Sequence, residues 1–137
     1  MTFDVRGVVV LGLVATAFAA GCPPSMGQHM NAADAPCRSG SSNAQISQCF
    51  SAAYQDADKK LNDVYRRVMA TLGPEQQKAL QAAQLLWIRF RDANCEVEHG
   101  LYEGGSAAPM VLDACLEALT RQRADDLMTM LGYRLQR

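Results

Sequence analysis

Apolar residues recur every seven positions from about residue 43 onward, and this repeat constrains the fold more than any other feature of the chain. The repeat has two neighbouring rows, extended at its ends by Ile46 and Leu72. The rows consist of Phe50, Ala57 and Val64, and of Tyr54, Leu61 and Val68. Residues seven apart lie on one face of an α-helix, so the pattern predicts a helix of about 28 residues, roughly 40 Å long. Asn43 or Ser42 is suited to cap its start.

A short break at Gly73-Pro74 separates this helix from a second one. Glycine suits the left-handed position after a helix, and proline suits the first position of the next. So short a break predicts a tight antiparallel hairpin. The second helix is expected over residues 75–98, with an apolar set of Leu80, Ala83, Leu86, Trp87, Phe90 and Val97. Trp87, the one tryptophan, is expected to be a core anchor rather than a ligand-stacking residue.

A glycine-rich stretch, EHGLYEGGSAAP, interrupts the helical pattern after the second helix. Pro109 is suited to the first turn of a new helix, and Ser106 or Ala108 before it can start that helix. The third helix is expected over residues 109–131, with apolar residues Leu112, Leu116, Leu119, Leu127 and Met130. No segment alternates with period two over any length, so no strands are expected. The predicted fold is all-α: an antiparallel three-helix bundle spanning residues 43–137.

The N-terminus has the features of an export signal, expected over residues 1–21. The run from Gly7 to Gly21 is uncharged, follows Arg6 and ends in small residues. Cleavage after Ala17-Phe18-Ala19 would release a soluble protein, whereas the AAGC sequence ending at Cys22 resembles a bacterial lipobox. Residues 22–42 are rich in Pro, Gly, Ser and Asn and are expected to form a flexible tether. We therefore favour lipid attachment at Cys22 and a mature protein anchored in the cell envelope.

The five cysteines support this interpretation. Export implies an oxidising compartment, and without Cys22 four cysteines remain, which is enough for two disulfides. Antiparallel packing brings Cys49, Cys95 and Cys115 to one end of the bundle, next to Cys37. All three pairings are geometrically conceivable. We favour Cys37–Cys49 and Cys95–Cys115, because each closes a short loop and would stabilise the domain by roughly 3 kcal/mol.

Charge and motif content exclude several functions. The net charge of −1 provides no basic stripe for nucleic acid. Of the two histidines, His29 lies in the tether and His99 beside the glycine loop. Neither accompanies a nucleophile–base pair or a Cys-x-x-Cys spacing, so no catalytic residue, metal ligand or cofactor is expected.

Three charged residues lie close to the apolar faces: Asp58 on the first helix, Arg91 on the second and Arg123 on the third. A buried charge requires a partner. We expect Asp58 to pair with Arg91 or Arg123 across the bundle, as an ion pair that fixes helix orientation rather than as a ligand site.

Three segments resemble a bacterial envelope family, the lysozyme-inhibitor LprI-like N-terminal domain. They are ADKKLNDVY (57–65), LQAAQLLWIRFRDANC (80–95) and GGSAAPMVLDACLEALTRQRADDL (104–127). The resemblance covers about residues 37–131 and includes the Gln84-x-x-Trp87-x-x-x-Arg91-Asp92 spacing. It implies an exported, helical and often lipid-anchored protein that binds lysozyme and so protects peptidoglycan. The fold carries over more directly than the inhibition.

The acidic residues around the glycine loop indicate where such a partner would bind. The expected contact set is Glu96, Glu98, His99, Tyr102 and Glu103, with Tyr102 as its aromatic anchor. Lysozymes are generally basic, so an acidic loop on a rigid scaffold would attract them. The alternatives are an envelope interaction module with another protein partner and no effect on lysozyme, an enzyme of unrecognised type, and an ordinary solvated loop.

Overall fold

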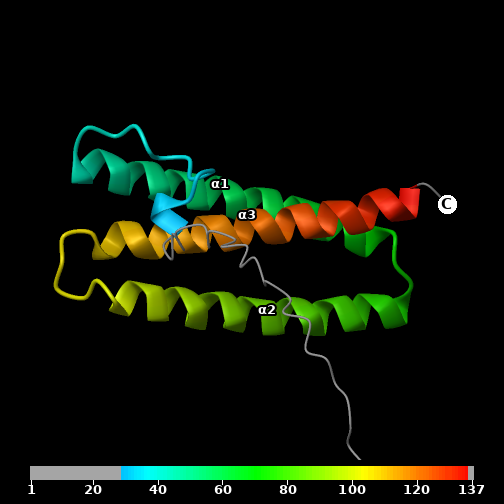
Figure 1. Ribbon diagram of the computed structural model, residues 1–137. Helices are drawn as coiled ribbons and strands as arrows, with labels where there is room; N and C mark the ends of the chain where they lie inside the picture. Colours follow the sequence, from blue (N-terminus) through cyan, green and yellow to red (C-terminus); the bar gives the residue numbers. More distant parts are fainter. Residues whose placement is uncertain (1–28, 136–137) are drawn as a thin grey trace, which may run out of the picture.

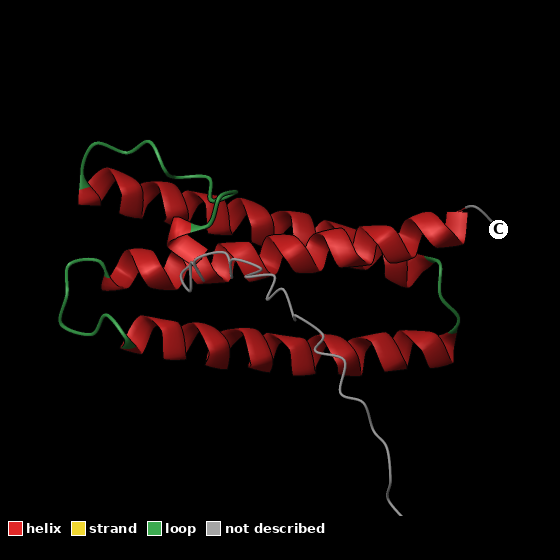
Figure 2. Ribbon diagram, viewed as in Figure 1, coloured by secondary structure: helices red, strands yellow, loops and turns green. Residues whose placement is uncertain are grey.

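The computed structural model describes residues 29–135, and all regular structure in that range is helical (Figure 2). A short 3₁₀-helix, η1 (His29–Asn31), precedes three long helices: α1 (Asn43–Ala70), α2 (Pro74–Gly100) and α3 (Ala108–Leu135). In Figure 1 the chain runs along α1, returns along α2 and runs forward again along α3. The expected signal segment 1–21 and Cys22 lie outside the described residues.

The first helix begins and ends close to where the sequence predicts. Ser42 is its N-cap, because the Ser42 hydroxyl accepts a hydrogen bond from the Gln45 backbone N–H. Both apolar rows face inward, and five of their members are buried: Phe50, Ala57, Leu61, Val64 and Val68. The seven-residue repeat is therefore a core face along the whole helix.

The connection between α1 and α2 differs from the expectation in its backbone. Gly73 has φ −73° and ψ 166°, an extended conformation, and it is the N-cap of α2 rather than a left-handed residue after α1. Pro74 is the first residue of α2, as expected. The Gln77 side-chain amide donates hydrogen bonds to the carbonyls of Met69 (3.0 Å) and Leu72 (3.1 Å). These bonds satisfy one carbonyl in the last turn of α1 and one in the connection that follows it, and so join the two helices at this turn.

The third helix is the element that holds the fold together, because it packs against α1, α2 and η1. The main core lies between α1 and α3, where Val68, Ala124 and Leu127 are fully buried. A second cluster at the other end contains Phe50, Met110 and Ala114. Among residues 29–135, no helix is long and apolar enough to cross a membrane.

The apolar set expected on the second helix does not lie on a single face. Leu80 is buried and Trp87 packs against the main core, whereas Leu86, Phe90 and Val97 are 65%, 59% and 71% exposed. The expected apolar set is therefore divided between a buried face and an exposed face of α2, and Trp87 lies on the buried one. The α2 helix lies at an outer edge of the molecule, with α3 on one side only (Figure 1).

Two disulfides lie near the end of the molecule where α2 passes into α3. Cys37 pairs with Cys49 and Cys95 with Cys115, the two pairs that the sequence favoured. Cys95 and Cys115 are fully buried between α2 and α3. The 20-residue separation of this second pair encloses the glycine loop, so the bond limits how far α2 and α3 can part there.

Residues 29–42, which we call the strap, are packed against the helices rather than free. Ala35 and Cys37 are buried in the cluster that contains Phe50, and η1 lies against α3. The expected tether of residues 22–42 is therefore corrected over this part. Composition alone predicted a free segment, but a disulfide, the His29–Glu98 contact and the Arg121–Asp34 ion pair hold the strap in place.

Candidate functional site

The five residues expected to contact a partner fall into three different environments. Glu96 and His99 lie on the last turns of α2, which continues to Gly100. Tyr102 and Glu103 lie in the turn that follows, within the 101–107 loop. Glu98 is buried with 6% exposure, so it cannot be part of the contact surface.

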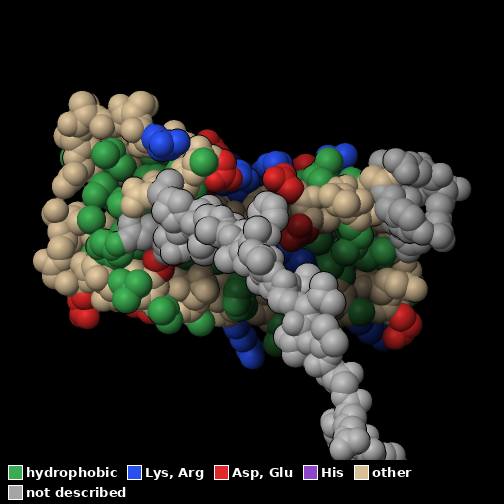
Figure 3. Space-filling view, in the orientation of Figure 1, with side chains coloured by type: hydrophobic (Ala, Val, Ile, Leu, Met, Phe, Trp, Pro, Cys, Tyr) green, Lys and Arg blue, Asp and Glu red, His purple; other side chains and the backbone are tan. Residues whose placement is uncertain are grey.

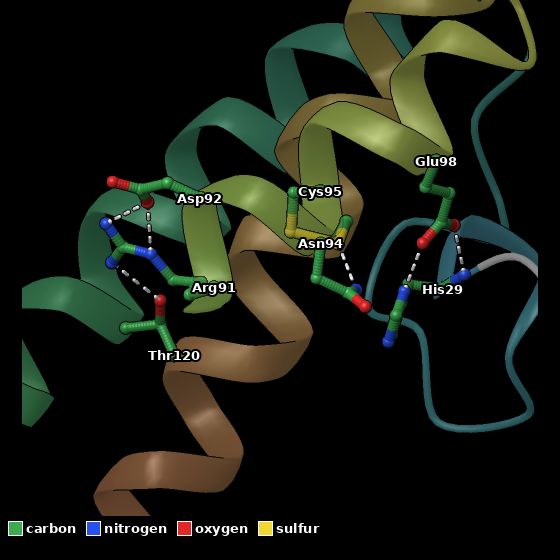
Figure 4. The surroundings of a disulfide bond; sticks show 8 residues. His29, Arg91, Asp92, Asn94, Cys95, Glu98 and Thr120 are labelled. Atoms are coloured by element: carbon green, nitrogen blue, oxygen red, sulfur yellow. Dashed lines mark hydrogen bonds and ion pairs between the residues drawn. A yellow bond between two sulfur atoms is a disulfide. The ribbon is translucent and has the colours of Figure 1, made fainter. Parts of the chain in front are cut away.

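Glu98 instead binds the strap (Figure 4). One oxygen of its carboxylate accepts a hydrogen bond from the His29 backbone N–H at 2.8 Å, and the other lies 2.6 Å from His29 Nδ1. Two hydrogen bonds to one buried carboxylate offset the cost of removing it from water. The pair joins residues 69 positions apart in the sequence, so it fixes the start of the strap beside the disulfide-bonded end of α2.

The remaining residues at this end form an exposed surface, which we call the loop surface: Glu96, Leu101, Tyr102 and Glu103. Leu101 is 74% exposed, Glu96 and Glu103 are exposed, and Tyr102 is partly exposed. Figure 3 shows apolar and acidic side chains together along this edge of the molecule. The surface therefore combines negative charge with apolar contact area.

The backbone of the 101–107 loop is held at several points. Gly105 N–H donates to the Tyr102 carbonyl at 2.9 Å, and the Asn43 side-chain amide donates to the Ser106 hydroxyl at 3.3 Å. Gly104 has φ +79°, a left-handed conformation that glycine adopts without strain. Together with the Cys95–Cys115 bond, these contacts give the loop surface a defined position.

The Gln84-Trp87-Arg91-Asp92 spacing builds a cluster between helices rather than a ligand site. Arg91 is 8% exposed and pairs with Asp92 at 2.7 Å. Its Nη1 donates to the Thr120 hydroxyl on α3 at 3.3 Å. The Trp87 ring lies 5.2 Å from the Arg91 guanidinium, within the range of a cation–π contact.

Arg123 completes the cluster from α3. Its Nε donates to Gln84 at 3.0 Å, and its guanidinium lies 5.9 Å from the Trp87 ring. The expected pairing of Asp58 with Arg91 or Arg123 is wrong, because Asp58 accepts a hydrogen bond from Asn62 one turn further along α1. Arg91 forms its ion pair with the adjacent residue, Asp92, instead, and its Nη1 donates a hydrogen bond to Thr120.

A second ion network fastens the strap to α3. Arg121 Nη2 lies 2.9 Å from Asp34, and Arg121 Nε lies 2.8 Å from the buried Glu117. The hydrogen bond from Arg121 lowers the pKa of Asp34, and the hydrogen bond with Glu117 raises the pKa of Arg121. Both shifts favour the charged forms. Burial raises the pKa of Asp113, which lies on the first turns of α3.

Two further features bear on ligands. His29, Glu98 and Cys115 have ligand atoms within 4.8 Å of one another, but the Cys115 sulfur is bonded to Cys95, so only two of the three can bind a metal. An open pocket of about 560 Å³ lies between η1, the start of α1 and the 101–107 loop. It is lined mainly by apolar residues, Met30, Ile46, Phe50, Ala107 and Met110, beside Asn31, Arg38 and Asn43.

Sequence reasoning missed His29, Asp34 and Arg121 because each owes its role to a contact across many residues of chain. The strap carried one usable signal, the cysteine at position 37. The Cys37–Cys49 disulfide fixes the end of the strap on α1. This brings the residues that precede Cys37 close enough to the helices for His29 to contact Glu98 and for Asp34 to contact Arg121.

Comparisons with known proteins agree over the helical part of the chain. The sequence profile of the family described as "Lysozyme inhibitor LprI" matches residues 34–127. An uncharacterized protein of Rhizobium meliloti (strain 1021) is 32% identical over 108 residues, which are 69% of this chain and 78% of that protein. No solved structure matches significantly.

Proposed function

Because this chain belongs to the lysozyme inhibitor LprI family, we propose that it binds lysozyme and blocks its hydrolysis of peptidoglycan. The observation that carries the proposal is the family match over residues 34–127, which includes all of α1 and α2, the loop and most of α3. It also includes both disulfides. Inhibition of this kind needs a binding surface and no catalytic group of its own.

We place the contact at the loop surface. Its two exposed carboxylates, Glu96 and Glu103, attract a basic enzyme, and Leu101 and Tyr102 supply apolar area. The loop is braced by the Cys95–Cys115 bond and by the Asn43–Ser106 hydrogen bond, so little conformational entropy is lost on binding. The partner set proposed here differs from the expected one. It omits Glu98, which is occupied by His29, and the partly buried His99, and it adds the exposed Leu101.

The same function requires a location outside the cytoplasm. We propose export by the signal at residues 1–21 and lipid attachment at Cys22, which would leave the helical domain on the envelope side of a membrane. Mass spectrometry of the N-terminal peptide from the natural host tests this, since a diacylated cysteine at position 22 has a distinctive mass. A peptide beginning at Ala20 would show the soluble form instead.

The test of inhibition is a lysis assay on a peptidoglycan suspension, with lysozyme titrated by the disulfide-intact protein. We expect lysis to slow in proportion to added protein and the effect to weaken with salt. The double variant Glu96→Gln, Glu103→Gln should weaken inhibition by about tenfold or more, because it removes both exposed charges of the loop surface.

A matched control removes the same kind of charge elsewhere. Glu75→Gln lies at the opposite end of α2, in an exposed pair with Lys78, and should leave inhibition unchanged. Equal losses in both variants would show that net charge, not the loop surface, is responsible. Full lysis at a large excess of wild-type protein would reject the proposal and favour an envelope module with a different protein partner.

A further inference from the structure

The second helix carries an exposed apolar row that the fold does not use. Its members are Ala79, Ala83, Leu86, Phe90, Ala93 and Val97, all of them exposed, and we call them the α2 seam. The spacing along the seam alternates between four and three residues. That alternation is the heptad pattern by which one α-helix packs lengthwise against another. A neighbouring face of α2, with Leu80 and Cys95, is buried.

An apolar seam of this kind is unusual on the surface of a soluble domain. Leu86, Phe90 and Val97 each expose more than half of their surface, and the three lie on one line because their positions are four and seven residues apart. Contiguous apolar surface marks an interaction site far more often than scattered apolar residues do. In Figure 1 α2 is an outer edge of the molecule, so a further helix can lie against it.

The charges beside the seam indicate which helix packs against it. Arg89 and Glu96 are exposed and lie on the same flank of the seam, seven residues apart. Among residues 29–135, Arg89 has no acidic partner, and Glu96 has only a distant contact of 3.8 Å with His99. We propose that the α2 seam binds the same seam of a second copy of this chain, with the two helices antiparallel about a two-fold axis.

The two-fold axis makes the seam complementary to itself. It brings Arg89 next to Glu96 of the partner subunit, and the symmetry repeats that pair on the other copy. In the same register Phe90 lies against Ala93 of the partner subunit, so the largest seam residue faces a small one. A parallel pairing keeps each Arg89 about 10 Å along the helix from Glu96 of the partner subunit, and it loses both pairs.

The size of the seam sets the strength to expect. It spans 19 residues, about 28 Å of helix, and such a contact falls at the low end of specific interfaces, near about 1,000 Å² in total. The dimer should therefore be in equilibrium with the monomer at micromolar concentrations rather than permanent. The loop surface lies at one end of α2, so the two proposed contacts, with lysozyme and with a second copy, are separate except at Glu96.

Sedimentation equilibrium of the disulfide-intact protein over a range of concentrations tests the proposal. We expect the mass to rise from one chain to two with increasing concentration. Phe90→Glu should raise the dissociation constant by about tenfold or more, since it removes a central apolar anchor. Leu85→Glu is the matched control. Leu85 is 56% exposed and directly precedes the seam residue Leu86, but it lies off the seam. Its replacement should therefore leave the dissociation constant unchanged.

A charge exchange distinguishes this dimer from other uses of the seam. Arg89→Glu and Glu96→Arg should each weaken association, because each places like charges together, and the double exchange should restore it. A single-chain mass at every concentration would overturn the proposal, as would a dimer indifferent to Phe90→Glu. A protein that is always monomeric but loses lysozyme inhibition with Phe90→Glu would assign the seam to lysozyme and also overturn it.

Discussion

At the scale of single residues, Glu98 differs from its acidic neighbours at the disulfide-bonded end of α2, which we call the braced end. Its carboxylate is buried and holds the strap, so it is not part of the loop surface. Both carboxylate oxygens of Glu98 contact His29. Glu96, two residues earlier on the same helix, is exposed. The difference follows from helical geometry, since residues two apart on a helix point about 200° apart. Glu98 faces the strap and Glu96 faces solvent.

Replacing His29 with alanine tests this role. The change leaves one oxygen of a buried carboxylate without its partner, so the free energy of unfolding should fall by about 1–3 kcal/mol. The matched control is His99→Ala, which removes the 3.8 Å contact of the partly buried His99 with the exposed Glu96 and should change stability by less than about 0.5 kcal/mol. Urea denaturation measures both. Equal effects would show that the His29 contact is not structural.

Asp113 provides a prediction about pH. Burial raises the pKa of this carboxyl group in the folded protein, so folding disfavours its charged form. Its contribution to stability is therefore fully present below the pKa of the unfolded chain and is lost as the pH rises through the higher folded pKa. Asp113→Asn should raise the melting temperature at pH 7 and leave it unchanged near pH 3. A lower melting temperature at pH 7 would contradict the assignment.

Residue-level pairing was the part of the site that sequence reasoning predicted least well. Asp58 was expected to meet an arginine across the bundle, but a partner one turn away on its own helix, Asn62, is nearer. Arg91 likewise uses Asp92, its neighbour in the chain. Long side chains reach many partners, so helical position restricts the choice without deciding it.

At the scale of elements, the helices were predictable because their ends carry local signals. Ser42 is an N-cap and Pro74 starts a helix, and both depend only on neighbouring residues. The face of α2 was not predictable in the same way. Leu80 and Trp87 lie seven residues apart on one face, while Leu86, Phe90 and Val97, spaced four and seven residues apart, lie on another. Periodicity identifies both as apolar faces, and only packing on α3 decides which one is buried.

The two disulfides offer a comparison between elements. Replacing Cys95 and Cys115 with alanine should lower the free energy of unfolding by about 3 kcal/mol, from the loss of loop-closure constraint. It should also weaken lysozyme inhibition, because the 101–107 loop then loses its brace. Chemical denaturation and the lysis assay measure the two effects.

Replacing Cys37 and Cys49 is the matched control. The Cys37–Cys49 bond closes a loop of similar length, 12 residues against 20, so its loss should lower stability by a similar amount, about 3 kcal/mol. The bond holds the strap rather than the loop surface, so inhibition should persist in the folded variant. Loss of inhibition in this variant, with normal activity when Cys95 and Cys115 are replaced, would place the contact on the strap.

At the scale of the whole molecule, the two ends of the bundle are held together by different interactions. The end with the α1–α2 turn is closed by hydrogen bonds from Gln77 to the end of α1. The other end concentrates both disulfides, the strap contacts of Glu98 and a loop with a left-handed glycine at position 104. Rigid support around an exposed loop is the arrangement that favours binding of another protein.

The most direct test of this account is a calorimetric titration of lysozyme with the disulfide-intact protein at low and high salt. We predict saturable binding of one chain per lysozyme, weaker at high salt because the loop surface and the enzyme carry opposite charges. The Glu96→Gln, Glu103→Gln variant should bind less tightly and lose much of its salt dependence. Absence of binding at low salt would contradict the claim that the braced end of this bundle recognises lysozyme.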